Sequence, residues 1–301
     1  MNYRHAFHAG NFADCMKHAL LVWLLGALAR KPRPFFVLDT HAGPGFADLA
    51  SAPAARTQEW QAGIGRLLAE EPPAPVARYL GPAPLTPCLD PTPLAPYLDL
   101  VRRLGLYPGS PALIRALLRP GDRLACCELH PEDHAVLHRR FATDPQVGVH
   151  RRDGYAAIKA LLPPPERRGL VLIDPPFEEP GEFERLVQAL RTGLARFPGG
   201  VFAAWYPIKH RAPLRDFFAA LQSAGLRDLV AAELWLRAPL DPERLNGCGL
   251  VVANPPWRFE EEVPPLLDAL LDGLRDHETE AGDANPGEPG AGTALIRLAD
   301  G

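Results

Sequence analysis

Short apolar segments, each followed by turn residues, recur along the whole chain, and this alternation limits the folds that it can adopt. Such segments are too short for helices and are typical of strands buried on both faces. They span residues 35–38, 124–127, 147–150, 170–173, 201–204 and 250–253. Helical patterns alternate with them at residues 14–28, 111–118, 131–141, 181–195 and 213–224. This order predicts an α/β sandwich, with helices on both faces of a doubly wound parallel sheet.

The composition bounds the class of protein. The 301 residues are 47% hydrophobic, which is enough for the core of one α/β domain with an insertion. The formal charge of −4 argues against a general binder of polyanions, so any nucleic-acid site must be local. Five scattered cysteines form no C-x-x-C pair, and the apolar run at 19–29 is shorter than the roughly twenty residues of a membrane span. We therefore expect a cytoplasmic chain with reduced thiols and no membrane partner.

Two stretches interrupt the alternation of strands and helices. Residues 49–106 contain proline-rich runs among short helical segments, which predicts an inserted helical subdomain in a main domain of residues 1–48 and 107–301. Residues 277–292 have the sequence HETEAGDANPGEPGAG, which buries too little apolar surface to order itself. This run predicts a flexible loop before a last strand at 294–298.

The tetrapeptide DPPF at 174–177 follows the apolar strand LVLI, so it stands at the carboxyl edge of the sheet, where open α/β sheets bind ligands. An adenine amino group is a weak nucleophile because its lone pair is delocalised into the ring, and it needs acceptors that hold it. The Asp174 carboxylate and the Pro175 carbonyl can each accept one N–H, and a flipped base can stack on Phe177. We therefore assign Asp174, Pro175 and Phe177 to a catalytic site for amine methylation.

Two alternatives stand beside this assignment. A D-P-P tripeptide also occurs as a plain rigid turn after a strand. A second copy of the pattern, NPPW at 254–257, follows the strand LVVA. The order along the chain favours the first copy, because the other parts of a nucleoside site precede it.

Those other parts end three earlier strands. Gly43 and Gly45 let the backbone approach a ligand at a strand-to-helix turn. Glu128 ends the strand LACC, where a carboxylate can accept both ribose hydroxyls, and the insertion accounts for its distance from the glycines. Asp153 and Gly154 suit an adenine ring whose amine donates to the aspartate. Each signal alone also fits a tight turn or a surface acid, but their order favours a nucleoside-containing cofactor.

With these residues in view, the chain resembles the RlmJ family, bacterial enzymes that methylate the N6 amino group of an adenine in 23S ribosomal RNA. The resemblance runs nearly end to end and rests on YRHAFHAGNFADCMKH, LDTHAG, YPGSP, ELHP, RRDGY, GLVLIDPPF, WYP and NPPW. The N-terminal motif is the most specific of these. The resemblance implies a class I (Rossmann-like) methyltransferase sandwich with a helical insertion, and S-adenosyl-L-methionine as the methyl donor.

The resemblance also implies roles for single residues. Together with the glycine turn, it assigns binding of the methyl donor to seven residues: His18, His41, Gly43, Ser110, Glu128, Asp153 and Gly154. It gives Asp174 the catalytic role. Residues 1–18 would form a flap over the active site, from which Tyr3 contacts the target nucleotide, and we add Arg4, His5 and Lys17 to that substrate-binding group.

Three features depart from the family pattern: the proline-rich insertion, Phe177 in place of the more frequent tyrosine, and the acidic loop near the C-terminus. A basic cluster at 209–215 is either a solvated loop or an RNA contact beside the site. His18 could equally be a buried hydrogen-bonding residue. His5, His8, His18 and His41 lack the acids and the spacing of a metal site, so we expect no metal.

We therefore expect a monomeric S-adenosylmethionine-dependent methyltransferase that acts on 23S rRNA before the ribosome is fully assembled. Methylation of DNA adenine or of a protein glutamine is an alternative, since the D/N-P-P-aromatic pattern serves all three amines. A nucleic-acid-binding relative that has lost catalysis is a further alternative. The sequence leaves the identity of the modified adenine open.

Overall fold

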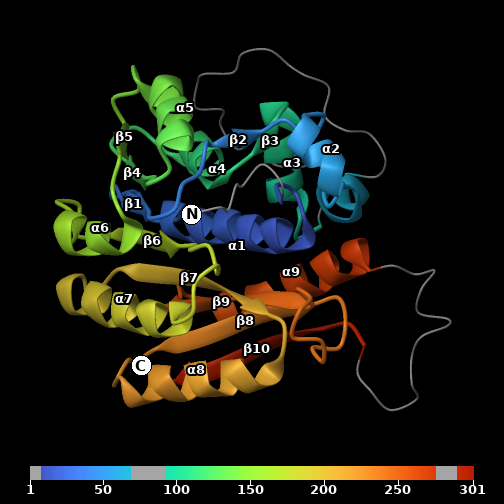
Figure 1. Ribbon diagram of the computed structural model, residues 1–301. Coiled ribbons are helices and arrows are strands. Elements are labelled where there is room, and N and C mark those ends of the chain that lie inside the picture. The colour runs from blue at the N-terminus through green and yellow to red at the C-terminus, as the bar shows by residue number, and fades with distance from the viewer. Residues whose placement is uncertain (1–7, 69–91, 276–289) are drawn as a thin grey trace.

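An eight-stranded sheet forms the centre of the computed structural model, which describes residues 8–68, 92–275 and 290–301 (Figure 1). The strand order is β10-β8-β9-β7-β6-β1-β4-β5. One side of the sheet is parallel and consists of β1 (Phe36–Asp39), β4 (Arg123–Cys127), β5 (Val147–His150), β6 (Gly169–Ile173) and β7 (Val201–Ile208). The expected class I α/β fold is confirmed, and every predicted strand coincides with an observed one.

The other side of the sheet is antiparallel, so the predicted parallel arrangement holds for β1, β4, β5, β6 and β7. β9 (Gly247–Ala253) runs antiparallel to β7 and to β8 (Leu229–Trp235), and β10 (Gly292–Ala299) runs antiparallel to β8. Residues 236–246 join β8 to β9, and the Leu236 N–H donates to the Asn246 carbonyl at 2.9 Å. Antiparallel neighbours need no crossover helix, which explains why no helix separates these two strands.

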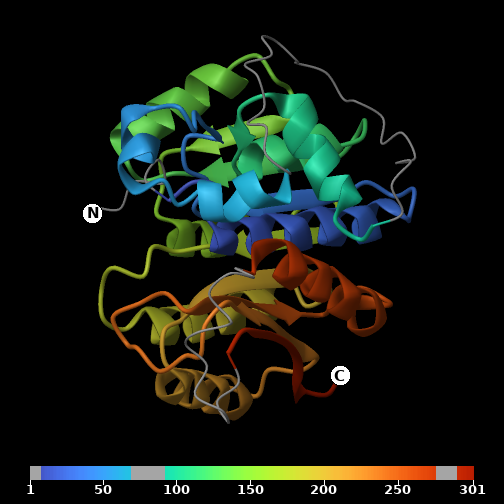
Figure 2. The same ribbon diagram turned by 90° about the vertical axis from the view of Figure 1, so that its right-hand side faces the viewer.

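Helices cover both faces of the sheet. One face carries α1 (Phe12–Ala29), α4 (Ser110–Leu117), α5 (Pro131–Phe141) and α9 (Phe259–Leu274), and Figure 2 shows α1 and α9 on the side that faces the viewer. The other face carries α6 (Gly154–Leu161), α7 (Glu182–Arg196) and α8 (Arg211–Ser223). The five predicted helices are present. The analysis of the sequence missed α6 and also α9, which contains Pro264 and Pro265.

The first helix is part of the core. By length and composition alone α1 could cross a membrane, but 67% of its residues are buried inside the protein. Asn11 caps it, since its side-chain oxygen accepts the Asp14 N–H at 2.9 Å. The sequence predicted a buried helix here, and the packing of α1 against α4 and α9 agrees with that prediction.

The proposed insertion leaves and rejoins the main domain at one place. β2 (Phe46–Ala47) pairs with β3 (Tyr107–Pro108), so the two ends of the intervening segment lie side by side. Between them lie α2 (Ala52–Thr57), the π-helical turn η2 (Gln61–Gly65) and α3 (Ala95–Leu104). The division into domains stays an interpretation. Most of the predicted loop at 277–292 lies outside the described residues, although Gly292 already belongs to β10.

A buried charge network joins three neighbouring strands. Glu233 of β8 is fully buried and accepts a hydrogen bond from the Tyr206 hydroxyl of β7 at 3.0 Å and another from Arg211. Tyr206 reaches Glu233 across β9 because Gly249 lies between them: a Cβ there would stand 2.3 Å from the hydroxyl oxygen. Only glycine at position 249 leaves room for the Tyr206 side chain to cross β9.

We expect Gly249→Ala to lower the free energy of unfolding by about 3 kcal/mol or more. The added methyl group overpacks the sheet and forces Tyr206 away from the buried Glu233 carboxylate. Urea denaturation would measure the change. Gly26→Ala is the matched control, because a Cβ at Gly26 meets nothing within 4 Å, and in helix α1 it should be neutral or stabilising. Equal effects of the two changes would contradict the explanation.

Asp39, the last residue of β1, is a buried carboxylate without a hydrogen-bond partner among the described residues. Burial is the main cause that raises the pKa of Asp39 to about 7, and the negative charge of Asp174 raises the pKa further. Ser110, Lys17 and the backbone of His41 lower the pKa and so oppose the shift. Because the ionised form is disfavoured in the folded chain, the free energy of unfolding must fall as the pH rises from about 4 to about 7.

Asp39→Asn should remove this pH dependence. At pH 8.5 the variant should be more stable than the natural chain by up to about 4 kcal/mol, at 1.36 kcal/mol for each unit of raised pKa. Near pH 4 the two proteins should differ little, because both side chains are then neutral in the folded state. Urea denaturation at the two pH values checks this, with the exposed Asp216→Asn as control. A difference that does not change with pH would refute it.

Candidate active site

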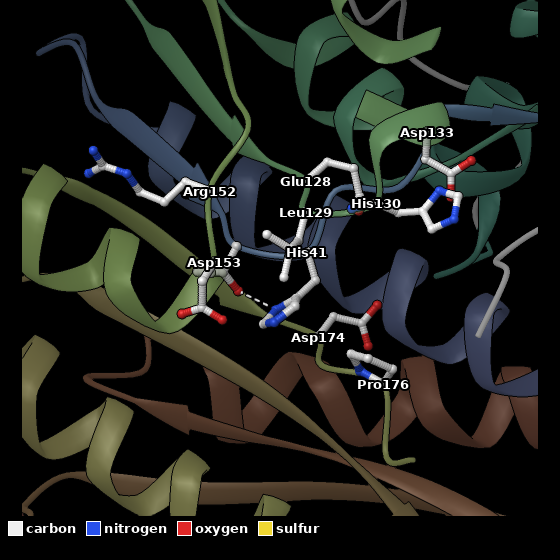
Figure 3. Close-up of a pocket in the computed structure, with 11 residues that line it drawn as sticks. His41, Glu128, Leu129, His130, Asp133, Arg152, Asp153, Asp174 and Pro176 are labelled. Atoms are coloured by element: carbon white, nitrogen blue, oxygen red, sulfur yellow. Dashed lines mark hydrogen bonds and ion pairs between the residues drawn. The ribbon is translucent and has the colours of Figure 1, made fainter. Parts of the chain in front are cut away.

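A cavity opens at the carboxyl edge of the parallel strands (Figure 3). Its walls come from the ends of four strands, β1, β4, β5 and β6, and from the residues that follow them. The lining residues are Thr40, His41, Glu128, Leu129, His130, Asp133, Arg152, Asp153, Gly154, Asp174 and Pro176. The structure thus brings together five of the residues that were selected from the sequence: His41, Glu128, Asp153, Gly154 and Asp174. Successive parallel strands end side by side, which explains this gathering.

Glu128 fixes the glycine turn to the end of β4. Its Oε2 accepts the Gly43 N–H at 2.8 Å, and its Oε1 accepts the His130 N–H at 2.7 Å. Gly43 has a φ of 62°, a conformation that favours glycine. Each carboxylate oxygen has a further lone pair, so the Glu128 carboxylate can still accept hydroxyl groups of a ligand.

Asp153 begins helix α6 as its N-cap, with its Oδ1 accepting the Ala156 N–H at 2.8 Å. Gly154 is buried, and a Cβ on it would stand 2.2 Å from the Thr40 carbonyl oxygen and 2.9 Å from a His41 ring carbon. The absence of a side chain therefore lets α6 approach the loop after β1. Through this contact, the Asp-Gly pair sets the distance between two walls of the cavity.

Asp174 forms a buried ion pair with helix α1. The Lys17 ammonium lies 2.5 Å from Asp174 Oδ2 and 2.8 Å from Asp14 Oδ1, and only 3% of Lys17 is exposed. Burial alone would lower the pKa of Lys17, but the two carboxylates raise it above its ordinary value. Lys17 therefore stays charged and fixes the orientation of the Asp174 carboxylate.

Three residues that were assigned to the methyl donor, His18, Gly43 and Ser110, do not line the cavity. His18 is buried, and its Nδ1 lies 3.0 Å from the Tyr107 hydroxyl. Ser110 is buried at the start of α4, close to Asp39. Their contact with the donor stays a prediction. Tyr3, Arg4 and His5 lie outside the described residues.

The aromatic residue of the first motif is held by two other rings. Phe177 is partly buried, with its ring 5.1 Å from that of Phe183 and 5.8 Å from that of Trp205, both in edge contact. Pro175 is buried directly after Asp174. Phe177 is not among the residues that line the cavity, so its role in stacking a base stays a prediction.

The second motif lies at the opposite edge of the sheet, because β9 runs antiparallel to β7. There the Asn254 amide donates to the carbonyl oxygens of Pro198 and Gly200, at 2.8 and 2.7 Å. NPPW therefore ties the loop before β7 to the end of β9. Of the two copies, only DPPF reaches the cavity.

The basic cluster at 209–215 has mainly structural contacts. Arg211 pairs with the buried Glu233 and stacks on Trp235 at 4.6 Å, and His210 caps α8 by accepting the Ala212 N–H at 3.1 Å.

Other residues that line the cavity were missed in the sequence, among them Thr40, His130 and Arg152, although each directly follows or nearly follows a strand end. Within the described residues, no group of His, Cys, Asp or Glu side chains is placed to hold a metal ion.

Comparison with known proteins identifies the family. The chain matches the family described as ribosomal RNA large subunit methyltransferase D, RlmJ, over residues 32–283. It is 38% identical over 275 residues to ribosomal RNA large subunit methyltransferase J of Haemophilus influenzae, covering 91% of this chain and 94% of that protein. The Escherichia coli protein of the same name is 36% identical over 271 residues, covering 90% and 92%.

A solved structure agrees with this match. The crystal structure of a protein from Legionella pneumophila superposes with a TM-score of 0.78 at 31% identity and covers 96% of this chain and 98% of its own. Sequence and structure thus correspond over almost the whole length. The chain belongs to the RlmJ family of ribosomal RNA large subunit methyltransferases.

Proposed function

We propose that this protein transfers the methyl group of S-adenosyl-L-methionine to the 6-amino group of an adenine in 23S ribosomal RNA. The observation that carries the proposal is a single cavity that combines Asp174 with the two acids of a nucleoside site, Glu128 and Asp153. Membership of the RlmJ family supports methyl transfer to ribosomal RNA. The amine-holding motif beside the cavity supports adenine as the methylated base.

The residues of the cavity fit the methyl donor. Glu128 keeps lone pairs for the ribose hydroxyls, and Asp153 keeps acceptor capacity for the adenine amine beyond the bond that caps α6. When bound, the donor supplies an electrophilic methyl group on a positively charged sulfur. The acidic lining, with Asp174 among it, favours such a cation over a neutral ligand.

Asp174 and Pro175 would hold the target amine. Lys17 already binds Asp174 Oδ2, so Oδ1 is the oxygen that accepts one N–H, while the Pro175 carbonyl accepts the other. Two acceptors favour the pyramidal form of the amine, in which its lone pair can attack the methyl carbon. The donor would supply the methyl group and keep the electrons of its broken S–C bond as a neutral thioether, while Asp174 and Pro175 hold the amine until its extra proton passes to water. No general base is required.

The surroundings of the amine complete the proposed site. The edges of Phe183 and Trp205 fix the ring of Phe177, which would stack on the extruded adenine without reordering its own side chain. An extruded base is easier to supply from RNA that is not yet packed into a ribosome, so we propose that 23S rRNA is the substrate before full assembly. We further propose that the protein acts as a monomer in the cytoplasm.

The test of the proposal is transfer of labelled methyl from S-adenosyl-L-methionine to protein-free large-subunit rRNA, followed by nucleoside analysis. Duplex DNA and a protein extract serve as competing acceptors. The expected product is N6-methyladenosine from the rRNA. Label in DNA or protein alone would overturn the substrate, and donor binding without transfer to any acceptor would overturn catalysis.

Asp174→Asn should lower kcat by at least about 100-fold, since it removes a charged acceptor from the amine in the transition state. The amide oxygen can still face Lys17, so the Kd of the methyl donor should change by no more than about threefold. Single-turnover methylation and calorimetric titration of the donor measure the two effects. Nearly full activity in this variant would disprove the role of Asp174.

Glu128→Gln should instead weaken donor binding, with a Kd raised roughly tenfold or more. The amide offers one acceptor oxygen in place of two, so it cannot hold both backbone N–H groups and both ribose hydroxyls. Glu132→Gln, an exposed change in the first turn of α5, is the matched control and should leave the Kd unchanged. An unaltered Kd in Glu128→Gln would remove Glu128 from the donor site.

A further inference from the structure

A group of arginine and histidine side chains lies on helix α5 and at the end of β5, and one of them, Arg152, lines the cavity. We call it the α5–β5 rim; it consists of His134, His138, His150, Arg151 and Arg152. Arg151, Arg152 and His138 are exposed, and the other two histidines are partly exposed. The His134 and His138 rings lie 5.8 Å apart on successive turns of the helix. The rim therefore presents five nitrogen-rich side chains to solvent beside the opening.

The rim lacks counter-charges of its own. Across the three described stretches of the chain, neither Arg151 nor Arg152 forms a hydrogen bond or an ion pair with a carboxylate, whereas Arg119, Arg123 and Arg185 all do. Two histidines of the rim are their neighbours, and Asp153 directly follows Arg152 in the chain. Burial, His138 and Arg151 lower the pKa of His134, and burial, Arg152 and His134 lower the pKa of His150, so Arg151 lies near His134 and Arg152 near His150.

The nearest acids are Glu128, Asp133 and Asp153, and each of them binds a group of its own segment or face of the cavity, while Glu128 and Asp153 keep acceptor capacity toward the cavity. Glu128 faces His134, but its two oxygens accept the backbone N–H groups of Gly43 and His130. Asp133 Oδ2 lies 3.8 Å from His130 Nδ1, and Asp153 Oδ1 accepts the Ala156 N–H and so caps α6. Unpaired arginines that lie together in a chain of net charge −4 indicate a local site for an anion.

The direction of Arg152 separates this surface from the donor site. Arg152 belongs to the lining of the cavity, yet Figure 3 shows its guanidinium pointing away from His41, Asp153 and Asp174. Its charged end therefore extends outward from the opening. An adenine that enters the cavity remains joined to its two neighbouring nucleotides, whose phosphates must pass over the surface around that opening.

We propose that the α5–β5 rim binds the phosphates of the RNA strand next to the target adenine. This inference rests on the proposed function and extends it by naming the RNA-contacting surface. Arginine presents a planar fork of donors that matches phosphate oxygens, and contacts of this kind fix the register of a strand without reading its sequence. The rim thus orients the strand, while the DPPF motif holds the base.

The test compares RNA binding and methylation in the natural chain and in the double variant Arg151→Gln/Arg152→Gln. Release of about 0.7 counterion per phosphate contact of a single strand predicts that the Kd for rRNA rises roughly 10- to 30-fold at 0.1 M salt. The slope of log Kd against log salt should become shallower by about 1.4. The single variant Arg151→Gln should show about half of each effect on a logarithmic scale and keep the Kd of the methyl donor.

The matched control is Arg33→Gln/Arg227→Gln, which removes the same charge from exposed residues that precede β1 and β8 at the opposite edge of the sheet. It should leave the rRNA Kd and the salt slope unchanged. The inference is overturned if the rim variant binds RNA as the natural chain does, if the control loses as much affinity, or if Arg151→Gln weakens the donor instead. Absence of RNA methylation by the natural chain would overturn the proposed function itself, and direct RNA binding keeps the two failures distinguishable.

Discussion

The buried Lys17 ammonium is the interaction on which the arrangement of the site depends. It bridges Asp14 on its own helix and Asp174 at the end of β6, so it ties the first helix of the chain to the strand that carries the proposed catalytic residue. A buried charge that loses its partner costs about 3–5 kcal/mol. Helix α1 and strand β6 therefore stabilise each other's position, and the Asp174 carboxylate is already oriented when a ligand arrives.

The direction of the strands then decides which residues meet at that carboxylate. β1, β4, β5 and β6 are parallel neighbours, so the residues after each of them share one edge. Glu128 strengthens this arrangement by bonding the backbone of the turn after β1, and Gly154 does so by letting α6 approach Thr40. Contacts between neighbouring strand ends thus form the cavity. Each contact depends on the type of residue, because Glu128 accepts an N–H of the turn after β1 and Gly154 has no side chain to clash with Thr40.

The sequence predicts this half of the molecule well because its signals are local. An apolar run followed by Glu128, Asp153 or Asp174 shows both the strand and the position of the acid at its end. The pairing of Lys17 with Asp174 spans 157 positions and has no local pattern, so Lys17 was assigned to the substrate instead of the carboxylate. Arg152 was also missed, although it stands two residues after the end of β5.

The other half was harder to predict because tertiary contacts override local preference there. The segment LVAAELW of β8 is rich in residues that favour helices, and its Glu233 is tolerated in a central strand only because Tyr206 and Arg211 reach it. Pro264 and Pro265 hid α9, whose acidic first turn and packing against α1 nevertheless support a helix.

The two X-P-P-aromatic segments show how far a motif depends on the strand that carries it. Asn254 and Asp174 both end buried strands, but an amide carries two N–H donors and a carboxylate carries none. Asn254, with a φ of 52°, donates to two backbone carbonyls and closes a loop. Asp174 can only accept, so it pairs with an ammonium and has one oxygen for an amine. An acceptor is what amine methylation needs, and of the two segments only DPPF, which follows the parallel strand β6, brings one to the edge where the cavity lies.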